Sequence, residues 1–285
     1  MGGKYAFLRV ISAGPYSAVI SMDNETVELQ NIYVGLVFLM AGQSNMQFKL
    51  NESTEKHYIS NPLVRLFSTD RIEDTDCFHS ADGWVVCDEK TAGEWSAIAY
   101  YAGNMVSQKL NVAVGLISCY QGASVIESWL PEGTLEKNGI VIPDEGKNID
   151  HFFENYSSWN TDGTLYEKAL GQVVPFKVSA IVWYQGENDA SSGEAPFYKD
   201  ELKLLIDAWR KDFDDLSLPF VIVQIADTYK GIGWKTLQKA QYDIQSEVNC
   251  VKTVISADVC EKDEIHPPTK DKLSQRIADA LCGMI

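Results

Sequence analysis

The stretch FLMAGQSNMQF, residues 38–48, joins two signals that organise the rest of the chain. It completes an almost continuous apolar run that begins at Ile32, and it then turns abruptly into Gly-Gln-Ser-Asn. An apolar run without alternation is typical of a strand buried on both faces, as in a parallel sheet. The stretch therefore predicts a buried strand that ends in a glycine turn, with Ser44 between two amide side chains.

The same alternation of apolar runs and helical patterns continues along the chain. Five further segments read as strands: 64–68, 112–120, 178–186, 219–226 and 251–258. Helical periodicity covers 95–110, 197–213 and 236–248, and a last helix is expected to open at Pro268 and run through Ala280. Alternating strands and helices predict a three-layer α/β fold with a central parallel sheet.

Two regions fall outside this alternation. Residues 1–30 predict a short β-rich N-terminal segment, with strands at 5–11, 16–22 and 26–30 and a turn at Asp23-Asn24. Residues 31–285 then form the main domain. Within it, the polar stretch 131–162 has little pattern and is expected to be an insertion over one face.

Composition limits the classes of partner. The 285 residues suit one large domain, and the net charge is −16. With a pI of about 4.6, the chain repels phosphate, so nucleic acid and anionic membranes are not expected partners. No apolar run reaches the roughly 18 residues of a membrane helix. The N-terminus lacks a signal-peptide core, so we expect a cytoplasmic location, although a removed leader would leave no trace. Oligomeric state is not readable.

Cysteine and histidine spacing gives no sign of a metal site. The six cysteines form no CxxC pair, and the four histidines are scattered. We therefore expect free thiols, no metal and no cofactor. A bridge between Cys77 and Cys87 across a small loop is the open alternative.

Four polar clusters follow the predicted strands at the point where each one ends. They are Ser44, Gly122, residues 186–189 and residues 263–266. The carboxyl ends of parallel strands lie along one edge of the sheet, where ligands bind in folds of this kind. Residues far apart in the sequence are therefore expected to converge on one cleft.

The chemistry of this set is that of a serine hydrolase. A serine hydroxyl is a weak nucleophile unless a base takes its proton, and His266 is the candidate base for Ser44. Asp263 could orient the ring of His266 and stabilise its protonated form. The oxyanion of a tetrahedral intermediate needs donors, for which we nominate the backbone N–H groups of Ser44 and Gly122 and the side-chain amide of Asn188.

The ordered motifs GQSNM, YQGASVIESW, WYQGEND and DEIHPP resemble those of the SGNH hydrolase superfamily. More narrowly, the segments VGLVFLMAGQSNM, IVWYQGEN and EIHPPTKDKLSQRIA resemble sialate O-acetylesterase-like carbohydrate esterases, and the resembling segments span residues 34–281. The resemblance implies a flavodoxin-like α/β/α core, no metal, and removal of acetyl groups from sugar hydroxyls. It implies the same roles for Ser44, His266, Asp263, Gly122 and Asn188.

Several assignments stay open at this point. Glu264 competes with Asp263 as the acid that orients His266. Gln43 and Asn45 could contact substrate or only tie down the turn, and Gln185 and Glu187 are alternative polar contacts to Asn188 for the substrate.

These features together predict a metal-independent serine esterase that removes O-acetyl groups from a carbohydrate, like a sialate O-acetylesterase or an acetylxylan esterase. The expected partner is an acetylated glycan or small molecule. Alternatives are a non-catalytic carbohydrate-binding relative and a lipase-like esterase on longer acyl chains. A glycosidase using Glu187 and Asp263 would leave Ser44 unexplained.

Overall fold

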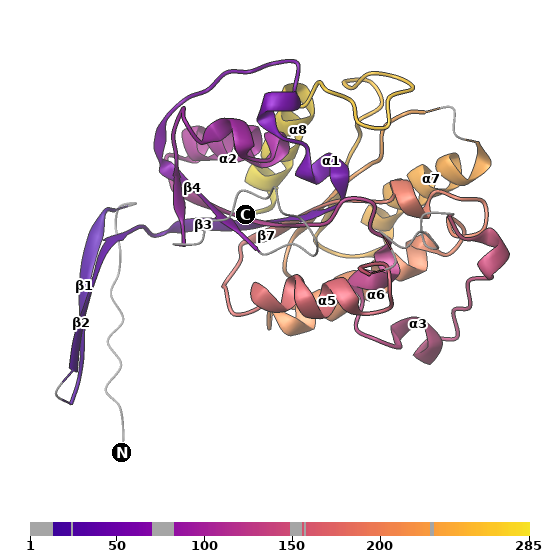
Figure 1. The fold of residues 1–285 in the computed structure, drawn as a ribbon, viewed down its shortest axis with the longest axis horizontal. Helices are drawn as coiled ribbons and strands as arrows, with labels where there is room; N and C mark the ends of the chain where they lie inside the picture. Colours follow the sequence, from indigo (N-terminus) through magenta and orange to yellow (C-terminus); the bar gives the residue numbers. More distant parts are fainter. Residues whose placement is uncertain (1–13, 24, 70–82, 149–155, 157, 229–230) are drawn as a thin grey trace.

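A computed structural model describes residues 14–23, 25–69, 83–148, 156, 158–228 and 231–285. A twisted sheet runs through the middle of the molecule, with helices above and below it, and a two-stranded ribbon projects from one side (Figure 1). This is the three-layer α/β arrangement expected from the sequence.

The strands are β1 Tyr16–Met22, β2 Glu25–Ile32, β3 Gly35–Gly42, β4 Asn61–Ser68, β5 Val85–Cys87, β6 Ala113–Tyr120, β7 Ala180–Tyr184, β8 Phe220–Val223 and β9 Val251–Val254. The α-helices are α1 Ser44–Gln47, α2 Ala97–Leu110, α3 Thr134–Lys137, α5 Thr164–Lys168, α6 Tyr198–Asp212, α7 Ile232–Glu247 and α8 Asp271–Met284. Short 3-10 helices cover Leu50–Glu52, Ala92–Glu94, Ile126–Trp129, Asp144–Gly146, Leu170–Gln172 and Glu187–Asp189.

The sheet order brings the predicted functional loops together. Its seven strands lie in the order β5-β4-β6-β3-β7-β8-β9, and every neighbouring pair is parallel except β4 and β5. The central strand β3 pairs its last residue, Gly42, with Tyr120 of β6 and with Tyr184 of β7. The loops that follow these three strands therefore leave the sheet at the same level.

Burial on both faces explains the unbroken apolar run at β3. Phe38 and Met40 point into a core covered by α2 and α8, whereas Leu39 and Ala41 point into a second core covered by α6 and α7. All four side chains are fully buried. Successive side chains of a strand face opposite sides, so a strand between two helical layers has no polar face.

Most predicted elements are confirmed, but α7 begins at Ile232 and not at 236, the short helices α1, α3 and α5 were not predicted, and further differences follow. The edge strand β5 was not predicted, since three residues give too short a pattern to read. The last helix begins at Asp271 and not at Pro268, and it continues to Met284. Pro268 instead lies in the preceding loop, where its carbonyl accepts a hydrogen bond from the Thr54 N–H at 3.0 Å. The strands at 219–226 and 251–258 are shorter than expected.

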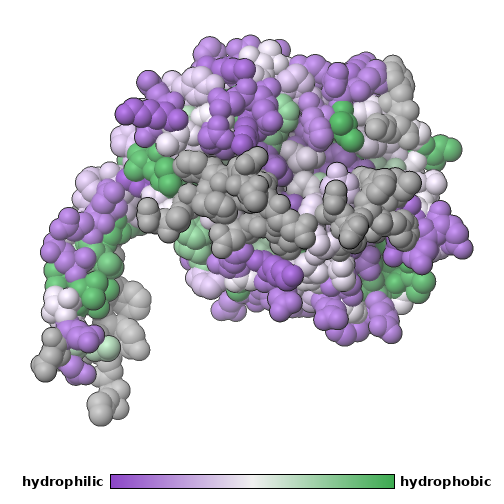
Figure 2. All heavy atoms as spheres, in the orientation of Figure 1, coloured by the Kyte–Doolittle hydropathy of each residue, from purple (hydrophilic) through white to green (hydrophobic). Residues whose placement is uncertain are grey.

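The N-terminal β-segment is confirmed for the described part of residues 1–30. β1 and β2 pair antiparallel as a separate two-stranded ribbon. The predicted strand at 5–11 lies outside the described residues. The ribbon carries exposed apolar side chains, visible as a green patch in Figure 2: Val19, Ile20, Met22, Val27 and Leu29. The boundary at residue 30 stays a prediction.

Three further observations concern the described residues alone. None of their helices combines the length and apolar character needed to cross a membrane. Cys87 is a free thiol, and Cys77, its partner in the alternative bridge, lies outside them. They contain no group of three or more histidine, cysteine or acidic side chains arranged to hold a metal ion.

A buried acid on α6 leads to a stability prediction. Glu201 is 1% exposed, and neither carboxylate oxygen has a hydrogen-bond partner. Burial, followed by the negative charge of Asp189, raises its pKa well above the usual value. Because the folded state therefore binds this proton more tightly, stability is lost as pH rises from the unfolded pKa towards the folded one.

We expect Glu201→Gln to stabilise the protein at pH 7 by about 1–3 kcal/mol, and to have little effect near pH 3, where the carboxyl is protonated in both states. Thermal unfolding at several pH values measures this. The exposed Asp200 on the same helix gives the matched control, Asp200→Asn. An equal effect of Glu201→Gln at both pH values would contradict the linkage.

Candidate active site

The turn that carries Ser44 requires glycine at position 42. Gly42 has a φ of +143°, and a Cβ added there would lie 2.0 Å from the carbonyl oxygen of Tyr184. The next N–H, that of Gln43, donates to the same carbonyl at 3.0 Å. The chain thus turns sharply against β7, and Ser44 becomes the first residue of α1.

Ser44 and His266 meet although 222 positions separate them. The hydroxyl oxygen of Ser44 lies 2.7 Å from Nε2 of His266, within the reach that a general base needs. Ser44 is half-buried, and the imidazole remains accessible from solvent. Partial burial, and secondarily the positive charge of Lys270, lower the pKa of His266. The ring is therefore held in the neutral form that can accept the proton of Ser44.

Donors for an oxyanion lie beside the serine. In the part of the chain that the structure describes, the backbone N–H groups of Ser44 and Gly122 have no hydrogen-bond acceptor. A Cβ added to Gly122 would lie 3.8 Å from Cβ of Ser44, so this backbone is close to the hydroxyl. Asn188 donates one amide N–H to the carbonyl of Ala123 at 2.6 Å, which leaves its second N–H free to donate.

A cavity of about 430 Å³ contains this group of residues. Its walls combine amide side chains with two aromatic rings from the polar stretch 131–162, Tyr156 and Trp159, whose ring centroids are 5.4 Å apart. The lining residues are Gln43, Ser44, Gln47, Gln121, Gly122, Ala123, Tyr156, Trp159, Asn188, Ile265 and His266. Polar amides beside aromatic faces suit a small ligand that is partly polar and partly apolar.

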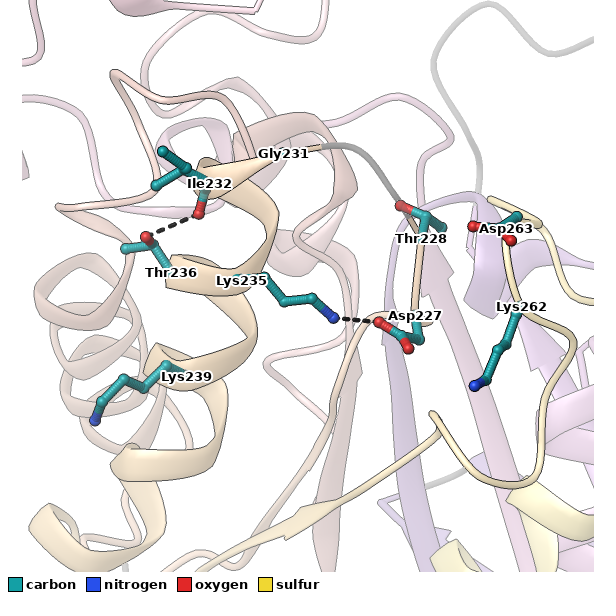
Figure 3. A pocket seen from close by; sticks show the side chains of 9 residues that line it. All are labelled: Asp227, Thr228, Gly231, Ile232, Lys235, Thr236, Lys239, Lys262 and Asp263. Atoms are coloured by element: carbon teal, nitrogen blue, oxygen red, sulfur yellow. Dashed lines mark hydrogen bonds and ion pairs between the residues drawn. The ribbon is translucent and has the colours of Figure 1, made fainter.

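The structure does not bring the predicted orienting acid to His266. Asp263 adopts a left-handed φ of +64°, and its N–H donates to the carbonyl of Asp227 at 3.0 Å. Its side chain lines a separate cavity of about 630 Å³ beside α7 (Figure 3). Glu264 is exposed and has no hydrogen bond to the ring. Among the described residues, the one hydrogen-bond partner of the His266 ring is Ser44.

Three side chains nominated for substrate contact are buried and do not line the cavity with Ser44. Gln185 donates to the carbonyl of Ser124 at 2.9 Å and to Asp189, and it accepts from Tyr198. Asn45 and Glu187 hydrogen-bond to each other at 2.5 Å. Their contact with substrate stays a prediction. In this structure their hydrogen bonds connect the loops beneath the cavity to one another.

Gln43 is placed both to hold the turn and to contact a substrate. Its Oε1 accepts a hydrogen bond from the N–H of Gly186 at 3.1 Å, which ties the β3 turn to the β7 turn. The same side chain also lines the cavity.

The sequence interpretation missed some residues of this site. Gln47 and Gln121 line the cavity, and the buried Lys270 lies beneath it. Gln47 lies about one helical turn after Ser44 on α1, which was a readable signal, whereas Lys270 precedes α8 in a non-helical segment and its spacing from His266 carried none. Nothing in the sequence indicated that Gln121 would face the cavity.

Comparison with protein families gives a match over most of the chain. The family model described as "Carbohydrate esterase, sialic acid-specific acetylesterase" matches residues 34–283. This range contains Ser44, Gly122, Asn188 and His266.

Individual relatives are distant. The chain is 23% identical to a sialate O-acetylesterase from Homo sapiens and 22% identical to one from Pongo abelii. Each alignment covers 93% of this chain but 57% of the relative, so the chain spans little more than half the length of these proteins.

Solved structures confirm the fold. A carbohydrate acetylesterase from Xanthomonas citri superposes with a TM-score of 0.79 at 24% identity, covering 94% of this chain and 60% of the other. A protein from Arabidopsis thaliana gives 0.58 at 19% identity, covering 87% of this chain and 98% of the other. At these identities the likeness concerns the arrangement of helices and strands.

Proposed function

Because the chain belongs to the carbohydrate esterase, sialic acid-specific acetylesterase family, we propose that it is a serine esterase that removes O-acetyl groups from a carbohydrate. The observation that carries this proposal is the 2.7 Å contact between the Ser44 hydroxyl and Nε2 of His266. It stands in a cavity that also presents unpaired N–H donors. A nucleophile, a base and an oxyanion site are the three parts that acyl transfer requires.

The first half of the reaction forms an acetyl-enzyme. Ser44 attacks the acetyl carbonyl carbon while His266 takes the hydroxyl proton. The carbonyl oxygen becomes an oxyanion beside the N–H groups of Ser44 and Gly122 and the free amide N–H of Asn188. The bond between the acetyl carbon and the sugar oxygen then breaks, and His266 returns its proton to that oxygen.

The second half repeats these steps with water. Neutral His266 takes a proton from a water molecule, whose oxygen attacks the acetyl carbon of the Ser44 ester. The same donors stabilise the second oxyanion. When the bond to Ser44 breaks, His266 gives the proton back to the serine oxygen, and acetate leaves.

The cavity supports a sugar as the alcohol portion of the ester. Amide side chains such as those of Gln47 and Gln121 can bind hydroxyl groups, and Tyr156 and Trp159 present aromatic surface to the apolar face of a sugar ring. Acetylated sialic acid is the first substrate to test, since distant relatives are named sialate O-acetylesterases. Acetylated xylan is the second.

We expect Ser44-dependent hydrolysis of p-nitrophenyl acetate, with p-nitrophenyl octanoate hydrolysed at least about tenfold more slowly. The reason is that four amide side chains line the cavity around Ser44, namely Gln43, Gln47, Gln121 and Asn188, and a long acyl chain would displace water from them without replacing its hydrogen bonds. The measurement is kcat/KM for both esters, followed by acetate release from acetylated sialic acid and acetylated xylan. Equal or faster hydrolysis of octanoate would favour a lipase-like esterase. Absence of Ser44-dependent hydrolysis on all four substrates would favour a binding protein.

A further inference from the structure

A buried lysine lies directly beneath the nucleophile turn. Lys270 is fully buried, and its ammonium nitrogen donates to Oδ1 of Asn45 at 2.7 Å. The same nitrogen lies 4.7 Å from the ring centroid of Phe48 and 5.6 Å from that of Tyr184. Asn45 is the second residue of α1 and Phe48 directly follows its last residue, so one cation contacts the chain near both ends of the helix that carries Ser44. Burying a charge is costly, so this lysine requires an explanation.

The side chain of Asn45 is a junction between three segments. While its oxygen accepts from Lys270, its nitrogen donates to the carbonyl of Ile265 at 2.7 Å and to Glu187 at 2.5 Å. The amide thus uses its acceptor and both N–H donors. Reversing the amide would place N–H against ammonium and oxygen against two acceptors, so the three partners fix its orientation.

This junction connects the two residues of the proposed reaction through their chain neighbours. Asn45 follows Ser44, and Ile265 precedes His266. The hydrogen bond from Asn45 to Ile265 therefore fixes the two backbones next to the 2.7 Å contact between the serine hydroxyl and the imidazole. We propose that Lys270 is a positioning residue that acts through Asn45 to hold Ser44 and His266 in register, an inference that rests on the proposed esterase function.

The charge of Lys270 has a second consequence at the base. It disfavours a proton on His266 and lowers the pKa of that ring, although burial is the larger cause and Glu52 opposes both. Burial lowers the pKa of Lys270 itself to about 8, against the opposing influence of the surrounding groups, which are Cys260, Glu187, Glu261 and Glu52. Lys270 is therefore still mainly charged at neutral pH, where it helps to keep His266 neutral.

The test is Lys270→Met, which keeps the buried aliphatic volume but removes the donor and the charge. We expect kcat on p-nitrophenyl acetate to fall about 10- to 100-fold, with KM little changed, because misplacement of a reacting group costs rate and not binding. We also expect the acid limb of kcat/KM to move to higher pH, since the repulsion on His266 is gone. Because greater exposure of His266 would move that limb in the same direction, the variant must also show the parental circular dichroism and thermal unfolding. Lys272→Met, on the exposed side of α8, is the matched control.

A second variant separates the hydrogen bond from the charge. Lys270→Gln retains an N–H donor, so its kcat should lie between those of the parent and Lys270→Met, while its acid limb should move as far as that of the methionine variant. It also serves if Lys270→Met does not fold, as judged by circular dichroism and thermal unfolding. Folded variants with the parental kcat and acid limb would overturn the inference.

Labelling of Ser44 by a fluorophosphonate keeps the two proposals distinguishable. This probe reports an activated serine without needing an acetyl substrate. If the parent is labelled and Lys270→Met is labelled at the same rate, the positioning role fails while the function stands. If the parent is labelled but hydrolyses no ester tested, the substrate assignment fails while slower labelling of the variant still supports the inference. A parent that is not labelled contradicts both.

Discussion

Ser44→Ala is expected to lower ester hydrolysis by roughly 10⁴- to 10⁶-fold, the largest effect of any single substitution in this chain. The hydroxyl is the atom that forms the acetyl-enzyme, and a methyl group cannot replace it. The oxyanion donors and the cavity remain intact in the variant, so KM should change little. Steady-state kinetics on p-nitrophenyl acetate measure both constants.

The control for this experiment is Ser246→Ala. Ser246 is exposed on α7, and its hydroxyl donates only to a backbone carbonyl, that of Asp243, at 2.7 Å. Its loss should leave turnover at the parental level. Parental turnover in Ser44→Ala itself would exclude an acetyl-enzyme on Ser44.

His266→Gln is expected to reduce kcat by about 10³-fold or more. The imidazole is needed twice in each half-reaction, once to take a proton and once to return it, and general acid–base catalysis contributes about 10²- to 10⁴-fold per step. Glutamine keeps a polar group near Ser44, but its amide is not basic enough to accept the proton of the serine. His57→Gln is the matched control, since His57 is largely exposed and pairs with Glu55 on the surface.

The pH profile of the parent enzyme should reflect the ionisation of His266. Burial and the charge of Lys270 lower the pKa of His266 below the ordinary value of 6.5. Because the neutral ring is the active form, the acid limb of kcat/KM should lie below pH 6.5, and the rate should rise with pH through that limb. A limb at or above pH 6.5, or one unchanged in His266→Gln, would show that another group is the base.

The secondary structure was largely readable from the sequence because its signals are local. The unbroken apolar run at β3 predicted burial on both faces, and Leu202, Leu205 and Ile206 of α6 recur at helical spacing on its buried side. Short or edge elements such as β5 were missed, since three residues carry too little pattern. The start of α8 was misplaced because proline favours a first helical turn but does not require one.

The convergence of Ser44, Gly122, Asn188 and His266 was also predictable, since parallel strands present their carboxyl ends along one edge. The sequence alone thus determined the α/β class, the edge at which the site lies and the residues able to supply nucleophile, base and oxyanion donors. These follow from strand direction and residue chemistry, which need no knowledge of distances.

Only the tertiary structure decided what each neighbouring polar residue does. Asp263 is three positions from His266, yet its left-handed backbone turns it towards another cavity. Asn45 and Glu187 lie beside the key motifs in sequence but beneath the cavity in space, where Lys270 binds the amide of Asn45. Whether a polar side chain lines a cavity or lies below it depends on loop dihedral angles and on the packing of distant segments. A linear pattern of residue types contains neither.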